Sequence, residues 1–165
     1  MSKESKTRKS DKKTKICLAC SSGGHLTQML QLEPLYEKYE HFMITEDTVI
    51  SRSLNGIGNS YYVKLVNRRQ FQFPFVLIAN SIKVFGVLLK ERPSVIISTG
   101  ALNAVPVCYI AKLMGSQIIF IESFAKVHEP TLSGRLVSRI ADLFIVQWET
   151  MLHFYPKAVY GGSIY

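Results

Sequence analysis

Cysteine, acidic residues and clustered metal ligands are all scarce in this sequence. Its 165 residues include three cysteines and four scattered histidines, and no Cys/His group has the spacing of a metal site. The odd cysteine count and the lack of an apolar leader stretch predict a reduced compartment, the cytoplasm. We therefore expect no disulfide framework, no metal and no cofactor.

Two familiar nucleotide-binding motifs are incomplete in the glycine-rich stretch that begins at Lys15. A P-loop would have Lys-Ser/Thr after its last glycine, where His25 and Leu26 stand. A dinucleotide fingerprint would have a third glycine inside the next helix, and none is there. Glu46 lies about where the ribose-binding acid of that fingerprint would fall, so nucleotide binding stays open as an interpretation.

A long hydrophobic run without interruption is also lacking. The most apolar long segment, 71–89, is short for a membrane span and contains Pro74, Asn80 and Lys83. We expect a helix from Pro74 onward, with two interpretations open. One face lies on an anionic membrane surface, aided by flanking arginines and lysines, or the segment is an ordinary buried crossover helix.

Positive charge is concentrated at the amino-terminus. The formal net charge is +8, and residues 1–15 hold seven Lys/Arg against two acidic residues. We expect a flexible basic tail over residues 1–14 and one domain over 15–165. The tail has no aromatic residues between its charges and matches no recognised module, so nucleic-acid binding is not expected.

A short apolar strand over 16–20 runs into a glycine turn and then a helix. Paired glycines allow positive φ and close approach of a ligand, while the N–H groups of the next helix's first turn face an anion. Ser22, Gly23 and Gly24 are therefore candidate phosphate-binding residues, with His25 at the mouth of the loop.

The two cysteines of this strand formally match a redox CxxC motif. Cys17 and Cys20 are three apart within a strand, however, so they point to opposite faces, and a redox pair would sit at a helix start. We expect both to be buried, apolar thiols.

Strand and helix patterns alternate along the rest of the chain. Further strands are expected at 41–45, 61–65, 94–100, 117–122, 143–146 and 158–162. Helices are expected at 26–39 with an interruption at Pro34, at 103–114, 133–140 and 148–154, and a mobile loop at 51–60. This order predicts a single Rossmann-like α/β domain, a parallel sheet of about six strands with helices on both faces.

Parallel sheets bind ligands beyond the carboxyl ends of their strands. The loops at 22–25, 99–103 and 122–129 should therefore share one edge and form the candidate site. The remaining candidate substrate-binding or phosphate-binding residues are Thr99, Gly100, Asn103, Lys126 and Arg135.

Four motifs together resemble a known family. In order they are Cys20-Ser-Ser-Gly-Gly-His-Leu-Thr-Gln28, Ser98-Thr-Gly100, Phe120-Ile-Glu-Ser-Phe124 and Tyr160-Gly-Gly-Ser-Ile-Tyr165. They closely resemble the asparagine-linked-glycosylation protein fourteen family, whose bacterial members work in capsular and exopolysaccharide assembly. More distantly, the glycine loop and Ser-Thr-Gly turn resemble the amino-terminal half of MurG, a GT-B glycosyltransferase with a lipid-pyrophosphate acceptor.

The resemblance implies a split enzyme. This chain would be the acceptor-side half of an inverting glycosyltransferase, peripheral on the cytoplasmic face of the cell membrane, and a partner subunit would bind most of the UDP-sugar donor. The acceptor would be a lipid-pyrophosphate-linked saccharide. Eukaryotic relatives carry an amino-terminal membrane anchor where this sequence has a basic tail, so membrane attachment is an inference here.

Inverting sugar transfer needs a base for the acceptor hydroxyl and donors for the pyrophosphate. His25 is the candidate base, since histidine titrates in the useful range, and Glu122 is a candidate base or orienter of a sugar hydroxyl. His25 as a phosphate ligand stays open beside its role as base. In the structural alternative, His25 is a plain structural histidine and Glu122 pairs with a lysine or arginine. The competing function is a non-catalytic membrane scaffold or activator of the partner subunit.

The carboxyl-terminal 18 residues are rich in aromatic side chains. Aromatic residues are enriched at the buried centres of interfaces, so we expect this segment to meet the partner subunit. The alternative is that these rings seal the domain's own core. The candidate interface residues are Trp148, Phe154, Tyr155, Tyr160 and Tyr165.

Overall fold

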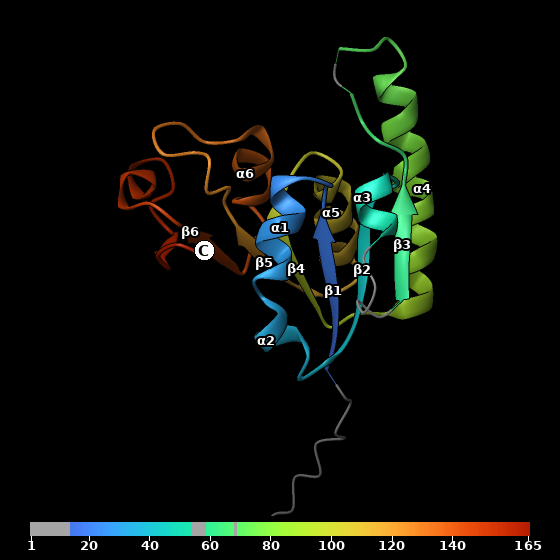
Figure 1. The fold of residues 1–165 in the computed structure, drawn as a ribbon, viewed down its shortest axis with the longest axis horizontal. Helices are drawn as coiled ribbons and strands as arrows, with labels where there is room; N and C mark the ends of the chain where they lie inside the picture. Colours follow the sequence, from blue (N-terminus) through green and yellow to red (C-terminus); the bar gives the residue numbers. More distant parts are fainter. Residues whose placement is uncertain (1–13, 54–58, 68) are drawn as a thin grey trace, which may run out of the picture.

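A seven-stranded sheet forms the centre of the molecule in a computed structural model that describes residues 14–53, 59–67 and 69–165 (Figure 1). All neighbouring strands are parallel, in the order β3-β2-β1-β4-β5-β6-β7. The strands are β1 (Lys15–Cys20), β2 (Glu40–Glu46), β3 (Asn59–Val63), β4 (Val95–Gly100), β5 (Gln117–Ile121), β6 (Leu143–Val146) and β7 (Val159–Tyr160). The predicted Rossmann-like fold is confirmed, and the strand expected at 158–162 is the two-residue β7, the seventh strand of a sheet expected to hold about six.

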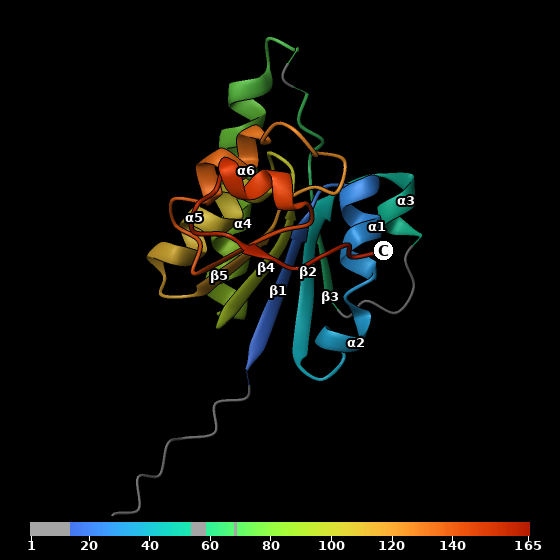
Figure 2. The same ribbon diagram turned by 90° about the vertical axis from the view of Figure 1, so that its left-hand side faces the viewer.

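Helices cover both faces of the sheet, as predicted. They are α1 (Gly24–Leu30), α2 (Glu33–Tyr36), α3 (Val49–Arg52), α4 (Phe73–Glu91), α5 (Ala104–Leu113), α6 (Leu132–Val137) and the 3-10 helix η1 (Glu149–His153). Figure 2 shows α4, α5 and α6 on one side and α1, α2 and α3 on the other. The larger hydrophobic core lies under α4, α5, α6 and η1, and a smaller one under α1 and α2.

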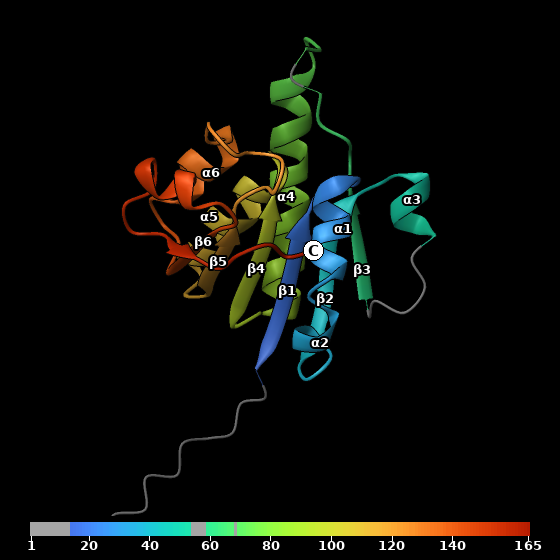
Figure 3. The ribbon, with the colours of Figure 1, turned by 60° about the vertical axis from the view of Figure 1, so that its left-hand side comes forward.

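The chain order reverses between β1 and β4, which are neighbours at the centre of the sheet. From β1 the chain winds outward to β3, then crosses back through α4 to β4 and winds outward the other way (Figure 3). Loops that follow the two central strands therefore separate at their carboxyl ends, where ligands bind in open parallel sheets. The glycine loop follows β1 and the Ser-Thr-Gly turn ends β4.

The two cysteines of β1 lie on opposite faces of the sheet, as predicted. Cys17 is fully buried in the larger core and Cys20 in the smaller one. Burial raises the pKa of the Cys20 thiol to about 12 and that of the Cys17 thiol well above its usual value. Neither cysteine therefore acts as a reactive thiolate.

Several boundaries differ from the sequence predictions; the helix expected at 133–140, for example, is α6 and ends at Val137. Ser51 and Arg52, expected in a loop, end α3, because Thr48 and Ser51 cap that helix reciprocally. Residues 54–58 of the expected loop lie outside the described residues. The strand β3 ends at Val63 because the Asn80 side chain takes both the N–H and the C=O of Lys64. The helix expected at 148–154 is the shorter, tighter η1.

Within the part of the chain that the structure describes, one helix, α4, is long and apolar enough by length and composition to cross a membrane. Only one face of α4 packs on the sheet, through residues such as Val84 and Leu88. The opposite face exposes large apolar side chains spaced by three or four residues. Together with Phe71, which lies just before the helix, we call these side chains the apolar stripe: Phe71, Phe75, Ile78, Ile82, Phe85 and Leu89.

The amino-terminal turns of α4 extend beyond the edge at which the strands end (Figure 1). The only acidic residue of the helix, Glu91, is buried at its other end and pairs with Lys15. The exposed surface of α4 therefore combines apolar side chains with Lys83 and Lys90 and carries no negative charge.

Candidate functional site

The glycine loop and the Ser-Thr-Gly turn are joined by a reciprocal pair of hydrogen bonds. His25 Nδ1 lies 2.7 Å from the carbonyl oxygen of Thr99, and Thr99 Oγ1 donates to the carbonyl of His25 at 2.7 Å. A carbonyl oxygen only accepts, so neutral His25 carries its proton on Nδ1. The half-buried ring is therefore held with the lone pair of Nε2 available.

Backbone strain is stored at the end of β4, beside this ring. Gly100 has φ +106° and Ala101 has φ +74°. Residues other than glycine rarely adopt a positive φ, so the strain lies at Ala101. A Cβ on Gly100 would lie 3.2 Å from His25 Cε1. Glycine at this position thus allows the turn to approach the His25 ring.

The glycine loop itself is partly exposed. Gly23 has φ +82° and, like Gly24, has open space where a side chain would lie. Ser22 was expected to bind a phosphate, but its N–H and its Oγ both donate to Glu46 Oε2 at 3.3 Å. Ser22 is thus turned toward the protein, and the phosphate-binding role of Gly23 and Gly24 stays a prediction.

Glu46, which sequence reasoning marked only as a possible ribose ligand, is 6% exposed at the end of β2. Its second oxygen, Oε1, accepts from Asn103 Nδ2 at 2.7 Å. Asn103, expected to bind substrate, has its side chain buried and directed to Glu46, Asn80 and Lys64. Both groups therefore hold protein loops together rather than opening onto solvent.

Glu122 is buried at the end of β5 and its carboxylate accepts four hydrogen bonds. Ser123 N–H and Thr131 Oγ1 donate to Oε1, both at 2.8 Å, while Tyr155 OH at 2.6 Å and Thr131 N–H at 3.3 Å donate to Oε2. The expected lysine or arginine partner is replaced by these hydroxyls and amides. Burial and the Glu122 hydrogen bond raise the pKa of Tyr155 well above its usual value.

The remaining basic candidates lie around the loop that Glu122 closes. Lys126 forms an ion pair with Glu129 in that loop, and Arg135 is exposed on α6. Within the described ranges, no hydrogen bond or ion pair joins either residue to the glycine loop. Their contact with a phosphate stays a prediction.

The carboxyl-terminal aromatics divide into core and surface. Tyr155 is 6% exposed and belongs to the larger core, so its expected place in a partner interface is wrong. Trp148 is half-buried and packs against the Phe124 ring at a tilt of 39°, and its Nε1 donates to the Phe124 carbonyl at 2.7 Å. Phe154, Tyr160 and Tyr165 are exposed and remain interface candidates.

A buried glutamine connects the glycine-loop helix to this end of the chain. Gln147 Nε2 donates to Gln28 of α1 at 3.0 Å and to the Glu122 carbonyl at 2.8 Å. Its Oε1 accepts from the Ile164 N–H at 2.9 Å. The sequence signal for Gln147 is its position: it is a polar residue directly after the buried strand β6, at the edge where ligands are expected.

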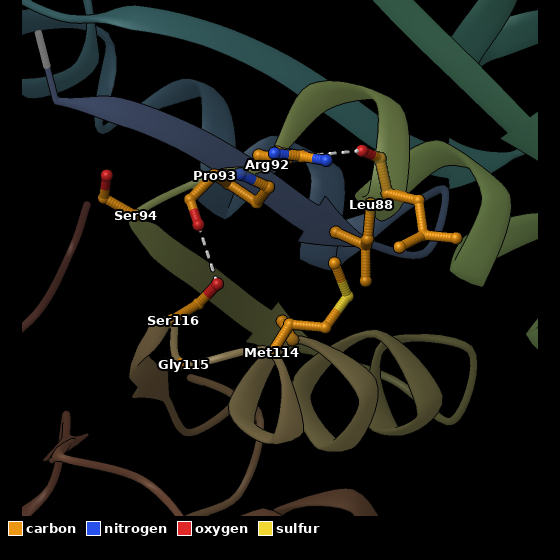
Figure 4. A pocket seen from close by; sticks show the side chains of 9 residues that line it. Leu88, Arg92, Pro93, Ser94, Met114, Gly115 and Ser116 are labelled. Atoms are coloured by element: carbon orange, nitrogen blue, oxygen red, sulfur yellow. Dashed lines mark hydrogen bonds between the residues drawn. The ribbon is translucent and has the colours of Figure 1, made fainter. Parts of the chain in front are cut away.

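One cavity lies at the opposite edge of the sheet, beside the amino-terminal ends of β4 and β5. About 510 Å³ in volume, it is lined by Leu88 and Arg92 near the end of α4 and by Met114 after α5 (Figure 4). Ser94 and Ser116, also in its lining, directly precede β4 and β5. This cavity is therefore separate from the candidate site at the carboxyl edge.

A smaller cavity of about 230 Å³ lies beside the carboxyl ends of β5 and β6. Its wall includes Ile121, Ile145 and Gln147 together with the chain terminus over 161–164. This hollow is closer to the candidate site, and Gln147 links its wall to Glu122 and Gln28.

The fold and these loops define a Rossmann-like domain of the GT-B type with a polar site at its topological switch point. Residues 16–164 match the family described as "Oligosaccharide biosynthesis protein Alg14 like", and the chain belongs to this family. The mouse protein named UDP-N-acetylglucosamine transferase subunit ALG14 is 27% identical over 179 residues, covering 91% of this chain and 82% of that protein.

Solved structures share the fold. MurG of Acinetobacter baumannii superposes with a TM-score of 0.67 at 12% identity, covering 83% of this chain and 42% of that one. A UDP-N-acetylglucosamine 2-epimerase from Rickettsia bellii gives a TM-score of 0.71 at 16% identity, covering 92% and 45%. The chain thus spans less than half the length of either of these two proteins.

Proposed function

We propose that this chain is the acceptor-side, membrane-associated subunit of a two-component inverting glycosyltransferase. A partner subunit carries most of the UDP-sugar site, and the acceptor is a saccharide linked to a lipid pyrophosphate. The observation that carries the proposal is that the chain is one Rossmann-like domain, related over almost its whole length to proteins named as transferase subunits, and matches under half of MurG.

In the proposed step, an acceptor hydroxyl oxygen attacks the anomeric carbon of the donor sugar. The bond from that carbon to the UDP β-phosphate oxygen breaks, UDP leaves with the electron pair, and the hydroxyl proton passes to His25 Nε2. The Thr99 carbonyl supports this role because it fixes the proton of neutral His25 on Nδ1. It also stabilises the imidazolium that forms.

Glu122 acts in this proposal through its contacts. With four internal donors on its carboxylate, it holds the loop from Ser123 to Thr131 against α6 and Tyr155. A direct role as a base would require those bonds to open. We therefore assign the proton transfer to His25 and the shape of the neighbouring loop to Glu122.

The apolar stripe supports peripheral membrane binding. Helix α4 exposes five large apolar side chains beside Lys83 and Lys90, and Phe71 just before the helix adds a sixth, as suits a helix lying on an anionic bilayer. Its amino-terminal turns extend on the side of the candidate site (Figure 1). A lipid-linked pyrophosphate would thus be presented at the edge where the glycine loop lies.

The cellular setting follows from the motif resemblance alone: we propose capsular or exopolysaccharide assembly on the cytoplasmic face of the cell membrane. The donor to test first is UDP-N-acetylglucosamine, because the relatives' names contain it. The sugar, linkage and acceptor are then set by substrate panels.

Reconstitution tests the proposal. A tagged full-length chain is used to isolate its partner, and transfer from UDP-sugars to extracted lipid-linked acceptor is measured for each subunit and for the pair. We expect no transfer by this chain alone, because half of a two-domain cleft cannot hold donor and acceptor together, and full transfer by the pair. Robust turnover by the single chain would refute the split enzyme.

A further inference from the structure

We propose that Asn80, Asn103 and Glu46 are positioning residues that fix the glycine loop relative to helix α4. Asn80 Nδ2 donates to Asn103 Oδ1 at 3.0 Å, and Asn103 Nδ2 donates to Glu46 Oε1 at 2.7 Å. Glu46 Oε2 then accepts from Ser22. One line of hydrogen bonds thus runs from the exposed helix to the loop that carries His25.

The backbone of Lys64 sets the orientation of the two amide side chains in this line. Its N–H donates to Asn80 Oδ1 at 3.0 Å, and its carbonyl accepts from Asn80 Nδ2 at 2.8 Å and Asn103 Nδ2 at 3.2 Å. Neither amide can turn over without placing like groups against each other. The line is therefore specific in orientation as well as in shape.

Burial makes these bonds consequential. Asn80, Asn103 and Glu46 are 4%, 5% and 6% exposed, so water does not replace a lost partner. No ion pair to Glu46 is found within residues 14–53, 59–67 and 69–165, so its buried carboxylate depends on the donors from Asn103 and Ser22. Removing one member leaves the next unsatisfied.

The glycine loop needs such support because Gly23 and Gly24 add no side chains to stiffen it. It is held at one end by Ser22 on Glu46 and at the other by His25 on Thr99. Loss of the first attachment frees the loop to turn about the second. A misplacement of about 1 Å at a reacting group costs about a hundredfold in rate, so turnover is sensitive to this attachment.

Amide hydrogen exchange of the full-length chain tests the positioning role without any activity. Asn80→Leu keeps the volume and removes the hydrogen bonds, and we expect exchange in peptides covering 22–25 to rise about tenfold while β4 and β5 stay unchanged. Ser81→Ala is the matched control, because Ser81 Oγ bonds only the Leu77 carbonyl of the same helix. It should leave the loop unchanged.

A second variant guards against a general disturbance of the α4 packing. Glu46→Gln keeps the shape, but its amide must face an N–H group of either Asn103 or Ser22, so we expect the same local rise. The double variant Asn80→Leu, Glu46→Gln should exceed neither single variant by much, since both break one line. Unchanged loop exchange in both folded single variants, or additive effects, would overturn the proposal.

The activity measurement rests on the proposed function and is read separately. In the reconstituted pair, we expect Asn80→Leu to lower kcat about tenfold or more with the KM for UDP-sugar within about twofold. A pair that is inactive even with the native chain refutes the proposed function, and the exchange result still decides the positioning role. A raised loop exchange with native kcat would show that this line does not position the reacting groups.

Discussion

Replacing Gly134 by alanine should destabilise the protein although Gly134 lies in a helix. Alanine is favoured over glycine in helices by about 1 kcal/mol. In α6, however, a Cβ at this position would overlap Glu122 Oε2 and Tyr155 OH and lie 2.9 Å from Glu122 Cδ. The carboxylate is buried and cannot swing into solvent.

The cost follows from the bonds that Oε2 makes. Displacing Oε2 breaks the hydrogen bonds from Tyr155 OH and the Thr131 N–H, and bonds to a charged group are each worth about 1.5 to 3 kcal/mol. Subtracting the helix preference leaves a net loss of about 2 to 5 kcal/mol in the free energy of unfolding. A protein with about 5 to 15 kcal/mol of stability would stay folded but shift visibly.

Urea unfolding followed by Trp148 fluorescence measures this loss, because Trp148 is the one tryptophan and packs on the loop that Glu122 closes. Gly86→Ala is the matched control: Gly86 lies within α4, has open space around it, and should gain up to about 1 kcal/mol. Tyr155→Phe removes the hydroxyl oxygen that a Cβ on residue 134 would overlap. It should therefore lower the free energy of unfolding less in the Gly134→Ala protein than in the native protein. A Gly134→Ala protein as stable as the native chain would refute the assigned role of Glu122.

Three further predictions address function. In the reconstituted pair, His25→Ala should lower kcat about a hundredfold, the scale expected for loss of a general base. The control His153→Ala, at an exposed histidine, should leave kcat unchanged. Native activity of the His25→Ala pair would favour the alternative in which this chain is a non-catalytic scaffold. Truncation after Lys157 should abolish co-purification of the partner, and a folded, shortened chain that still retains it would exclude this interface. Ile82→Ser should weaken binding to anionic vesicles at high salt, whereas the control Leu35→Ser, at an exposed position of α2, should not. Equal losses of binding in both variants would rule out the apolar stripe as the membrane-binding surface. Salt-independent binding by the intact chain would rule out an electrostatic contribution to binding.

The sequence was sufficient for the fold and for the meeting of the two central loops. Short apolar runs between turn residues placed all the strands within about two residues, and the rule for parallel sheets placed Thr99 beside His25. The helix α3 was missed because its capping box uses Ser51 in place of the usual Glu or Gln. Local signals thus predicted what depends on local chemistry.

Contacts distant in sequence were not predictable in this way. Asn103 and Glu46 are 57 residues apart, and the pattern marks Asn80 only as a polar interruption of an apolar helix. Tyr155 was placed on the surface because aromatic content does not say which way a ring points. It follows a 3-10 helix, whose period is not that of an α-helix, so the helical pattern gave no direction.

Two buried carboxylates organise the carboxyl edge of this domain, and they order its loops without any contact from a second subunit. Glu46 fastens the glycine loop to α5, and Glu122 fastens the next loop to α6, each by hydrogen bonds and, within the described residues, without an ion pair. Loops already ordered before association lose little further freedom when a partner or substrate binds. In the two-component enzyme that we propose, the ordering cost would be met during folding of this chain, so the binding energy of the second subunit would remain available to align donor and acceptor.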